Sequence, residues 1–336
     1  MVDQALGSRR SNKSLPSLTL TSPPCQCPKI WAISYSDLLK VGFRRTLDLN
    51  RSVVENAIRS FLAEDLGYGD ITTNALVDSE RGGEGRVVCR QNAVIAGIEE
   101  ALVLLELVGC HGTARAHDGD RVKAGAMILS ARGPARALLG VERTLLNLLT
   151  HMSGVATATA DLVSIGNRES RGKVRIACTR KTLPGLRYFE KRAVELGGGD
   201  THRLRLDDSV LIKDNHLELA GSVRECVRKA KETVSFTKKV EVEVTTPDQA
   251  VDAAKAGADI VLLDNMTPKE VERSVALLNT KNLRDGVLVE ASGGIRKENL
   301  ASYAKTGVDV ISVGAITHSA PAVDISLEIR GSRKRG

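Results

Sequence analysis

The sequence predicts an α/β protein in two parts, a small α+β domain followed by a closed or partly closed parallel β/α barrel. The main observation is that six short β-branched, apolar runs follow one another in the second half of the chain, most of them separated by a helical pattern. Strand–helix alternation of this kind produces right-handed crossovers and a parallel sheet. No G-x-G-x-x-G follows the first run, which disfavours an open dinucleotide-binding sheet. Residues 51–140 instead mix helical and strand patterns, as is typical of a small antiparallel α+β unit.

The composition is that of a soluble globular protein. Of 336 residues, 42% are hydrophobic and 26% charged, with 30 Gly and 9 Pro, which excludes collagen-like and disordered classes. No stretch approaches the roughly 18 apolar residues that span a bilayer, and residues 1–29 lack the apolar centre of a signal peptide. Aromatic residues make up 3%, too few for the stacking platforms that bind single-stranded nucleic acid. We therefore expect a cytoplasmic protein without a membrane or nucleic-acid partner.

The net charge of +7 comes from the two ends of the chain. Residues 1–50 carry +4 and the segment 330–336 carries another +4, which leaves about −1 for the body between them. Ser8–Pro28 is rich in Ser, Thr and Pro, so we expect residues 1–48 to be a disordered extension and 330–336 a solvated basic tail. The less favoured alternative is a tail that touches RNA or a membrane. The six cysteines show no C-x₂-C spacing, which favours reduced, buried thiols over a zinc site.

The first part of the chain is predicted to contain two helices, short strands and a long linking helix. Apolar residues from Val53 to Leu62 recur at helical spacing, and Gly67 follows as a stop. The long helix carries an apolar face that includes Leu145, Leu149 and Met152. The other expected elements are strands at Arg86–Cys89 and Ala93–Ala96, a helix at Ile98–Val108, two short strands around a turn within Gly119–Leu129, and the start of the long helix at Glu142.

The second part is predicted to alternate strands with helices. The strands are Val174–Cys178, Ser209–Ile212, Val240–Val244, Ile260–Leu263, Val287–Glu290 and Val310–Val313. The helices are Val223–Lys231, Pro247–Ala256, Pro268–Leu278 and Glu298–Lys305.

Each predicted strand ends in charged residues or a glycine-rich turn. In a parallel β/α barrel these ends meet at one mouth, where binding and catalysis are located. The residues are Thr179-Arg180-Lys181 after the first strand, Lys213-Asp214-Asn215-His216 after the second, Glu243 near the end of the third, Asp264 directly after the fourth, Ser292-Gly293-Gly294 after the fifth, and Gly314-Ala315 after the sixth. His202 and Arg203 lie in the connection that precedes the second strand.

These residues fall into three chemical groups. The cationic group suits an anionic ligand, because the Arg fork matches a carboxylate. Glu243 and Asp264 suit hydroxyl groups, a developing positive charge or a hard cation such as Mg²⁺. The glycine-rich turns suit a phosphate held by backbone N–H groups. Together they indicate a site for a phosphorylated sugar, a metal and a small polyanion.

Each group also has a structural interpretation. Arg180-Lys181 could be a solvated pair, Glu243 could share a solvent-facing strand surface with Glu241, and Asp264-Asn265 could cap a helix. Gly293-Gly294 could be only a tight turn, and His202 a satisfied structural histidine. The expected convergence of all of them at one mouth favours the functional interpretation.

The sequence resembles the quinolinate phosphoribosyltransferases, the carboxylating nicotinate-nucleotide pyrophosphorylases. The resemblance covers nearly all of 51–329 and is specific as a set. It rests on EDLGYGDITT (64–73), ERTLLNLLTHMSGVAT (142–157), TRKTLPGLR (179–187), GGGDTHRLRLDDSVLIKDNH (197–216), EVEV (241–244), LLDNM (262–266), EASGGI (290–295) and SVGAITHSAPAVDISLEI (312–329).

The resemblance implies an α/β-sandwich domain over 51–155, with a contribution from 316–329, and a six-stranded incomplete α/β (TIM-like) barrel over 156–315. It implies a pentosyl-transferring enzyme of NAD biosynthesis. Quinolinate and 5-phosphoribosyl-1-pyrophosphate (PRPP) would react with Mg²⁺ to give nicotinate mononucleotide, pyrophosphate and CO₂.

The resemblance also assigns roles to residues. Those matching quinolinate contacts are Arg143, Arg180, Lys181, His202, Arg203 and Lys213. Lys181, Glu243 and Asp264 match catalytic positions, and the two acids also match positions beside the metal, held directly or through water. The phosphate loops match Ser292, Gly293, Gly294, Gly314 and Ala315, with His318 close by. Arg143 matches an arginine contributed across a head-to-tail dimer, so we expect a homodimer or a dimer-built hexamer and an inactive monomer.

Two departures from the family pattern and two rival interpretations bear on this assignment. Cys178 stands where many relatives have Asp, and Asp200-Thr201 precede His202 where relatives vary. One rival is a related pyrophosphorylase-like protein associated with molybdenum transport, and the intact His202-Arg203 pair favours quinolinate. The other is a catalytically dead barrel, which the full set of charged strand ends argues against.

Overall fold

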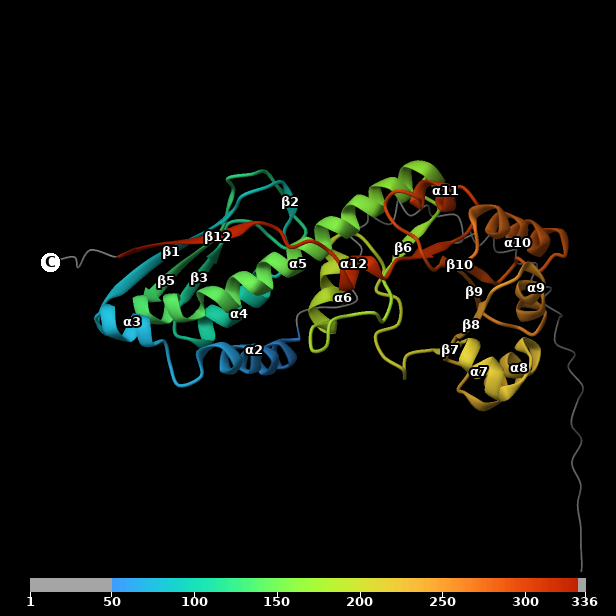
Figure 1. Cartoon of the computed structure of the whole chain (residues 1–336), viewed down its shortest axis with the longest axis horizontal. Helices are drawn as coiled ribbons and strands as arrows, with labels where there is room; N and C mark the ends of the chain where they lie inside the picture. Colours follow the sequence, from blue (N-terminus) through green and yellow to red (C-terminus); the bar gives the residue numbers. More distant parts are fainter. Residues whose placement is uncertain (1–49, 332–336) are drawn as a thin grey trace, which may run out of the picture.

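The computed structural model describes residues 50–331. All of the predicted 1–48 extension and the last five residues of the predicted basic tail lie outside the described residues. The described part has two lobes, with one long helix running from the first into the second (Figure 1). The fold class predicted from the sequence is confirmed, with a small sheet domain and a six-stranded parallel sheet.

Two helices open the first lobe. Helix α2 (Arg51–Leu66) begins at Asn50, whose side chain accepts the Val53 N–H, and it ends at Gly67 with a φ of 49°. It buries Val54, Ile58 and Leu62, one residue per turn. Helix α3 (Ile71–Leu76) follows after a short turn. The predicted first helix and its stop therefore match the structure.

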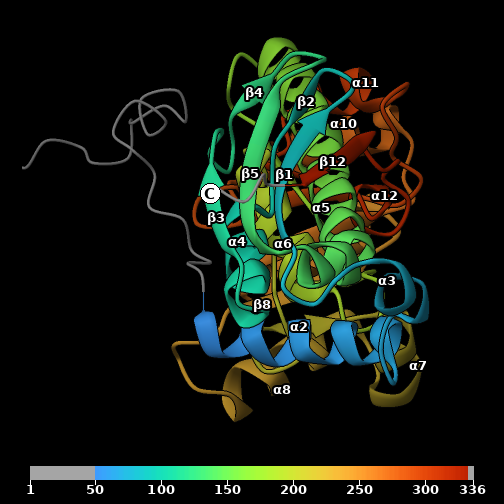
Figure 2. The ribbon, with the colours of Figure 1, turned by 90° about the vertical axis from the view of Figure 1, so that its left-hand side faces the viewer.

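The first lobe is built on a four-stranded antiparallel sheet in the order β12-β1-β5-β3. Figure 2 views it from the side of this lobe, with α2 running across one end. The strands are β1 (Gly82–Cys89), β3 (His111–Ala114), β5 (Met127–Pro134) and β12 (Ile325–Gly331). Arg330 pairs in register with Glu84, so the first two residues of the predicted basic tail are strand rather than tail.

The two short strands predicted around a turn within Gly119–Leu129 are present, but they do not pair with each other. Strand β4 (Arg121–Val122) pairs with β2 (Ala93–Val94), whereas β5 pairs with β1 and β3. The two neighbouring strands thus belong to different sheets, because long-range partners outcompete the local hairpin.

Two further helices cover this lobe. Helix α4 (Ile98–Leu107) packs on the sheet, and α5 (Ala135–Ser170) continues into the second lobe. The sequence predicted that α5 begins at Glu142, but Pro134 ends β5 and starts the helix directly. The apolar face predicted for α5 is buried in the core.

The second lobe is a six-stranded parallel sheet in the order β6-β11-β10-β9-β8-β7. Its strands are β6 (Arg175–Ala177), β7 (Val210–Ile212), β8 (Val240–Val244), β9 (Ile260–Asp264), β10 (Leu288–Ser292) and β11 (Val310–Ser312). The helices are α6 (Arg187–Leu196), α7 (Asp214–Ala220), α8 (Val223–Thr233), α9 (Pro247–Lys255), α10 (Pro268–Thr280), α11 (Leu300–Ala304) and α12 (Ala315–His318). Strands β6 and β7 are the two edges of the sheet, so strand pairing leaves the barrel incomplete.

Among residues 50–331, no helix is both long enough and apolar enough to cross a membrane.

A buried arginine joins the two lobes. Arg192 of α6 is 1% exposed and lies 2.7 Å from the Glu100 carboxylate of α4, with Glu99 and Asp118 also paired to it. One guanidinium thus faces three carboxylates. Burial, opposed by Arg192 and reinforced by Asp118, raises the pKa of Glu100 to about 7.

We predict that this glutamate makes the free energy of unfolding fall as the pH rises from about 4.5 to 7. The folded state keeps a proton that the unfolded state releases, so the stabilisation is full below the unfolded pKa and is lost as pH rises through the folded one. The loss is on the order of 3 kcal/mol at most. Urea unfolding across this pH range should show a smaller decline in Glu100→Gln, with exposed Glu106→Gln as the control. An identical decline in wild type and Glu100→Gln would contradict the assignment.

Candidate active site

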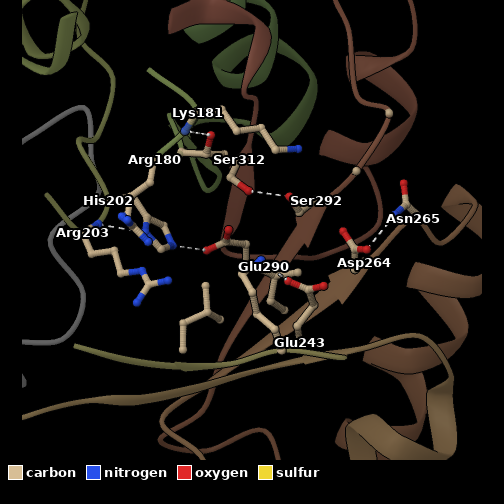
Figure 3. Close-up of a pocket in the computed structure, with 16 residues that line it drawn as sticks. Arg180, Lys181, His202, Arg203, Glu243, Asp264, Asn265, Glu290, Ser292 and Ser312 are labelled. Atoms are coloured by element: carbon tan, nitrogen blue, oxygen red, sulfur yellow. Dashed lines mark hydrogen bonds and ion pairs between the residues drawn. The ribbon is translucent and has the colours of Figure 1, made fainter. Parts of the chain in front are cut away.

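A cavity of about 420 Å³ lies at the carboxyl edge of the parallel sheet (Figure 3). It is lined by ten of the residues that the sequence singled out: Arg180, Lys181, His202, Arg203, Lys213, Glu243, Asp264, Ser292, Gly293 and Gly294. They come from the ends of five different strands and from the connection between β6 and β7. Parallel strands bring them together because all their carboxyl ends lie on one side of the sheet.

Four other predicted site residues do not line this cavity. Arg143 is exposed on α5, and Gly314, Ala315 and His318 belong to the start and body of α12. The α12 segment nevertheless supports Lys181, since the Thr317 hydroxyl donates to the Lys181 carbonyl at 2.7 Å. A Cβ built at Gly314 would lie 3.2 Å from Lys181 Cδ, so a side chain there would press on the lysine.

One wall of the cavity is cationic. The Nε atoms of Arg180 and Arg203 are buried and have no hydrogen-bond partner among the described residues. Burial, together with the Arg180 charge, lowers the pKa of Arg203. Two partly desolvated guanidinium groups that repel each other favour the binding of an anion, which neutralises their charge.

His202 is held in a strained position at the floor of the cavity. Its φ is 51°, in the left-handed region that non-glycine residues rarely occupy. Its Nε2 lies 3.3 Å from Glu290 and 3.5 Å from Glu241. Burial lowers the pKa of His202, but the two glutamates outweigh it and raise the value to about 10.

The backbone fixes which ring nitrogen carries the proton. The Arg203 N–H donates to His202 Nδ1 at 2.8 Å, so in this arrangement Nδ1 is an acceptor and Nε2 holds the hydrogen. A second ring proton would break this backbone hydrogen bond. The Nε2–H donates toward the glutamates, and because their charges raise the pKa of His202 to about 10, the ring takes its second proton near neutral pH at the expense of this backbone hydrogen bond.

Two glutamates of the site were not predicted from the sequence. Glu290 lines the cavity, and Glu241 lies beside His202. Both are buried, at 1% and 2% exposure. Burial and the neighbouring Glu290 raise the pKa of Glu241, against the opposing effect of His202. The signal was present in EVEV: residues two apart on a strand share a face, so Glu241 and Glu243 both point into the barrel. The solvent-facing alternative fails because helices cover the other face of the sheet.

The opposite wall is acidic. Glu243 pairs with Lys213 Nζ at 2.7 Å, and Asp264 accepts from the Asn265 side chain at 2.6 Å. The two carboxylates come from adjacent strands β8 and β9 and both line the cavity. Oxygen donors of this kind are the ligands that Mg²⁺ prefers, so the residues fit a hard cation.

The glycine turn after β10 requires glycine for steric reasons. Gly293 has a φ of 87°, and a Cβ there would lie 2.4 Å from Asn265 Oδ1 and 2.7 Å from its backbone nitrogen. Gly294 also has a positive φ, of 62°. Beside the turn, the Ser312 hydroxyl donates to Ser292 Oγ at 2.9 Å. The turn thus presents backbone N–H groups and hydroxyls to the cavity, a combination that binds phosphate.

Comparison with known protein families accounts for both lobes. Residues 70–153 match the N-terminal domain of quinolinate phosphoribosyl transferase, and residues 155–328 match its C-terminal domain. The chain belongs to the quinolinate phosphoribosyltransferase family. The cavity lies within the C-terminal domain match, and the exposed Arg143 within the N-terminal one.

Relatives within the family cover the chain over most of its length. The chain is 50% identical over 274 residues to a probable carboxylating nicotinate-nucleotide pyrophosphorylase of Methanothermobacter thermautotrophicus, covering 82% of this chain and 98% of that protein. It is 38% identical to the human nicotinate-nucleotide pyrophosphorylase, covering 81% and 90%.

Solved structures of the family share the fold. The nicotinate-nucleotide pyrophosphorylase from Francisella tularensis superposes with a TM-score of 0.76 at 37% identity, covering 84% of this chain and 98% of that one. NadC from Streptococcus pyogenes gives a TM-score of 0.79 at 33% identity, covering 85% and 99%.

Proposed function

We propose that the protein is a quinolinate phosphoribosyltransferase. It transfers the 5-phosphoribosyl group of PRPP to the nitrogen of quinolinate and releases CO₂, giving nicotinate mononucleotide and pyrophosphate for NAD synthesis. The observation that carries this proposal is one cavity with a cationic wall, an acidic wall and a glycine turn, in a chain of this family.

The cationic wall binds the dicarboxylate. Arg180 and Arg203 offer unpartnered guanidinium N–H groups that match carboxylate oxygens. Lys181 and Lys213 also line the cavity, and Lys213 pairs with Glu243 of the acidic wall. They contribute further positive charge where the two substrates meet.

The acidic wall stabilises the transferring ribosyl group. As pyrophosphate leaves, positive charge develops at the anomeric carbon, and the Glu243 and Asp264 carboxylates offset it. These two residues would also hold Mg²⁺, which supplies charge neutralisation for the pyrophosphate leaving group. The Ser292-Gly293-Gly294 turn binds the 5′-phosphate through backbone N–H groups.

Decarboxylation then depends on orientation more than on a base. Transfer leaves the ring nitrogen positively charged. This charge stabilises the electron pair that the breaking C–CO₂ bond leaves on the adjacent ring carbon, and that carbon then takes up a proton from water. The pocket therefore has to hold one carboxylate firmly while the carboxylate next to the ring nitrogen departs.

A single assay tests this function. Purified protein with quinolinate, PRPP and Mg²⁺ should release nicotinate mononucleotide and CO₂ in equal amounts, and a metal chelator should abolish both. Excess Mg²⁺ added after the chelator should restore both. Absence of both products from a folded protein would contradict the proposal, and full turnover in chelator would contradict the metal.

We also propose a homodimer, as such or as the unit of a hexamer, in which Arg143 reaches the site of the neighbouring subunit. Arg143 is exposed on α5 in its own chain. Around α3, which packs against the start of α5, Tyr68, Ile71 and Leu76 are at least 79% exposed. Large exposed apolar side chains close together in one region of the chain support a protein contact there.

We propose a cytoplasmic location as well. The four cysteines within the described residues (Cys89, Cys110, Cys178 and Cys226) are free and buried, as is usual in a reducing compartment.

A further inference from the structure

A buried lysine lies directly beneath the loop that carries His202 and Arg203. Lys191 of α6 is 0% exposed. Among the described residues, no carboxylate lies within ion-pair distance of its ammonium group. Burial lowers the pKa of Lys191, an effect that its contact with Cys178 opposes. A desolvated cation without a close counter-ion is costly, so its hydrogen bonds must be well placed.

The ammonium hydrogen bonds go to one short segment of backbone. Lys191 Nζ donates to the carbonyl of Thr201 and to the carbonyl of Arg203, the latter at 3.1 Å. These two carbonyls flank His202. The Cys178 thiol, at the end of β6, donates to the same Thr201 carbonyl at 3.3 Å. Burial raises the pKa of Cys178 to about 11, so the thiol is neutral and the lysine supplies the charge at this carbonyl.

The segment above Lys191 needs such support. His202 has a φ of 51°, in the left-handed region that a non-glycine residue occupies only at an energetic cost. The local hydrogen bonds that hold it are His202 N–H to the Asp200 side chain at 2.8 Å and Arg203 N–H to His202 Nδ1. Both are short-range and join only residues 200–203. Lys191 instead anchors the segment to the body of the barrel, through helix α6.

We propose that Lys191 is a positioning residue of the site: its ammonium fixes the backbone of residues 201–203 and thereby aims Arg203 and His202 into the cavity. This inference rests on the proposed function, because it assigns the aimed residues to the dicarboxylate. It predicts a specific defect. A displaced Arg203 should weaken the site for quinolinate, whereas the PRPP side, built from β8, β9 and β10, should stay intact.

The test is Lys191→Met, which keeps the length of the side chain and removes the donors and the charge. The KM for quinolinate should rise by roughly tenfold or more, since small displacements of positioning groups have effects of this size. The KM for PRPP should stay within about twofold, given the typical scatter of contributions from distant, uncoupled sites. Hydrogen exchange of the 201–203 backbone should become faster in Lys191→Met without any substrate present.

A second variant covers the case in which Lys191→Met does not fold. Lys191→Gln keeps an N–H donor without the charge. Its quinolinate KM should lie between those of wild type and Lys191→Met. If Lys191→Met does not fold, the quinolinate KM of Lys191→Gln should still exceed that of wild type. Phe189→Leu is the matched control, because Phe189 is equally buried on α6 but packs against Phe61 of α2. It should lower the unfolding midpoint and leave the ratio of the two KM values unchanged.

The outcomes separate the inference from the function on which it rests. No turnover in the wild type would reject the proposed function, and the exchange rates alone would then decide whether Lys191 holds the segment. Turnover in the wild type, with both KM values and the exchange rates unchanged in the Lys191 variants, would overturn the inference. An equal rise of both KM values would also overturn it, because that is what general loosening of the barrel produces.

Discussion

Arg203→Ala should remove turnover almost completely while the protein remains folded. The Arg203 guanidinium is partly desolvated, unpartnered at Nε and close to a second arginine, so its binding energy is available only to an anionic ligand. Loss of such a preorganised donor costs about 10²–10³-fold, and here a full charge is lost as well. We expect kcat/KM for quinolinate to fall by about three orders of magnitude, with Lys181→Ala similar. Steady-state kinetics at saturating PRPP measures this effect.

The stability of Arg203→Ala should not fall with its activity. Burial and the Arg180 charge disfavour the charged form of Arg203, so its removal should leave the unfolding midpoint unchanged or raised. The backbone of residue 203 still accepts from Lys191 in this variant. Arg205→Ala is the matched control, because Arg205 is exposed, two residues away and outside the cavity lining. Full activity in either Arg203→Ala or Lys181→Ala would remove that residue from the site.

Mixing two inactive variants should restore activity if Arg143 works in the neighbouring subunit. Arg143→Ala and Lys181→Ala should each be inactive as homodimers. In a mixed dimer, one site has both its own Lys181 and the partner copy's intact arginine, and the other site lacks both. Random pairing of equal amounts therefore gives about one quarter of wild-type activity in a symmetric dimer. The measurement is turnover after joint refolding or co-expression of the two variants.

The mixture should have a different activity if Arg143 acts in the site of its own chain. If the arginine served its own chain, every site in the mixed dimer would carry one defect, and mixing would restore nothing. A control mixture of Arg143→Ala with Arg203→Ala should behave like the first mixture, because Arg203 also lines the cavity of its own chain. A mixture of Lys181→Ala with Arg203→Ala should stay inactive, since each residue serves the cavity of its own chain and every site of the mixed dimer therefore carries one defect.

Much of the site could be predicted from the sequence because of one property of parallel sheets. Once the runs Val240–Val244 and Ile260–Leu263 are recognised as parallel strands, the residues at their carboxyl ends must meet, whatever the details of packing. The order of residues along the chain therefore suffices to bring Glu243 and Asp264 together. The same reasoning gathers Arg180, Lys181, Lys213 and Ser292 at the same mouth.

Local patterns also determined the elements that depend only on neighbouring residues. The helical spacing from Val53 to Leu62 and the stop at Gly67 correspond to α2 and its end. The helix start predicted at Glu142 is wrong, since Ala135, Leu138 and Val141 are already helical and buried. The chain becomes helical as soon as Pro134 ends the preceding strand.

The tertiary structure decided what depends on residues far apart in the chain. The pairing of Arg330 with Glu84 and the separation of β4 from β5 follow from long-range strand partners that no local pattern specifies. Neither helix α6 nor a role for Lys191 was predicted from the sequence, and only the fold places this lysine beneath the 201–203 segment. Spacing along the chain determines which side chains share a face of one helix or strand. Contacts between separate elements are determined by packing, and the contact of Lys191 with the 201–203 segment is of this second kind.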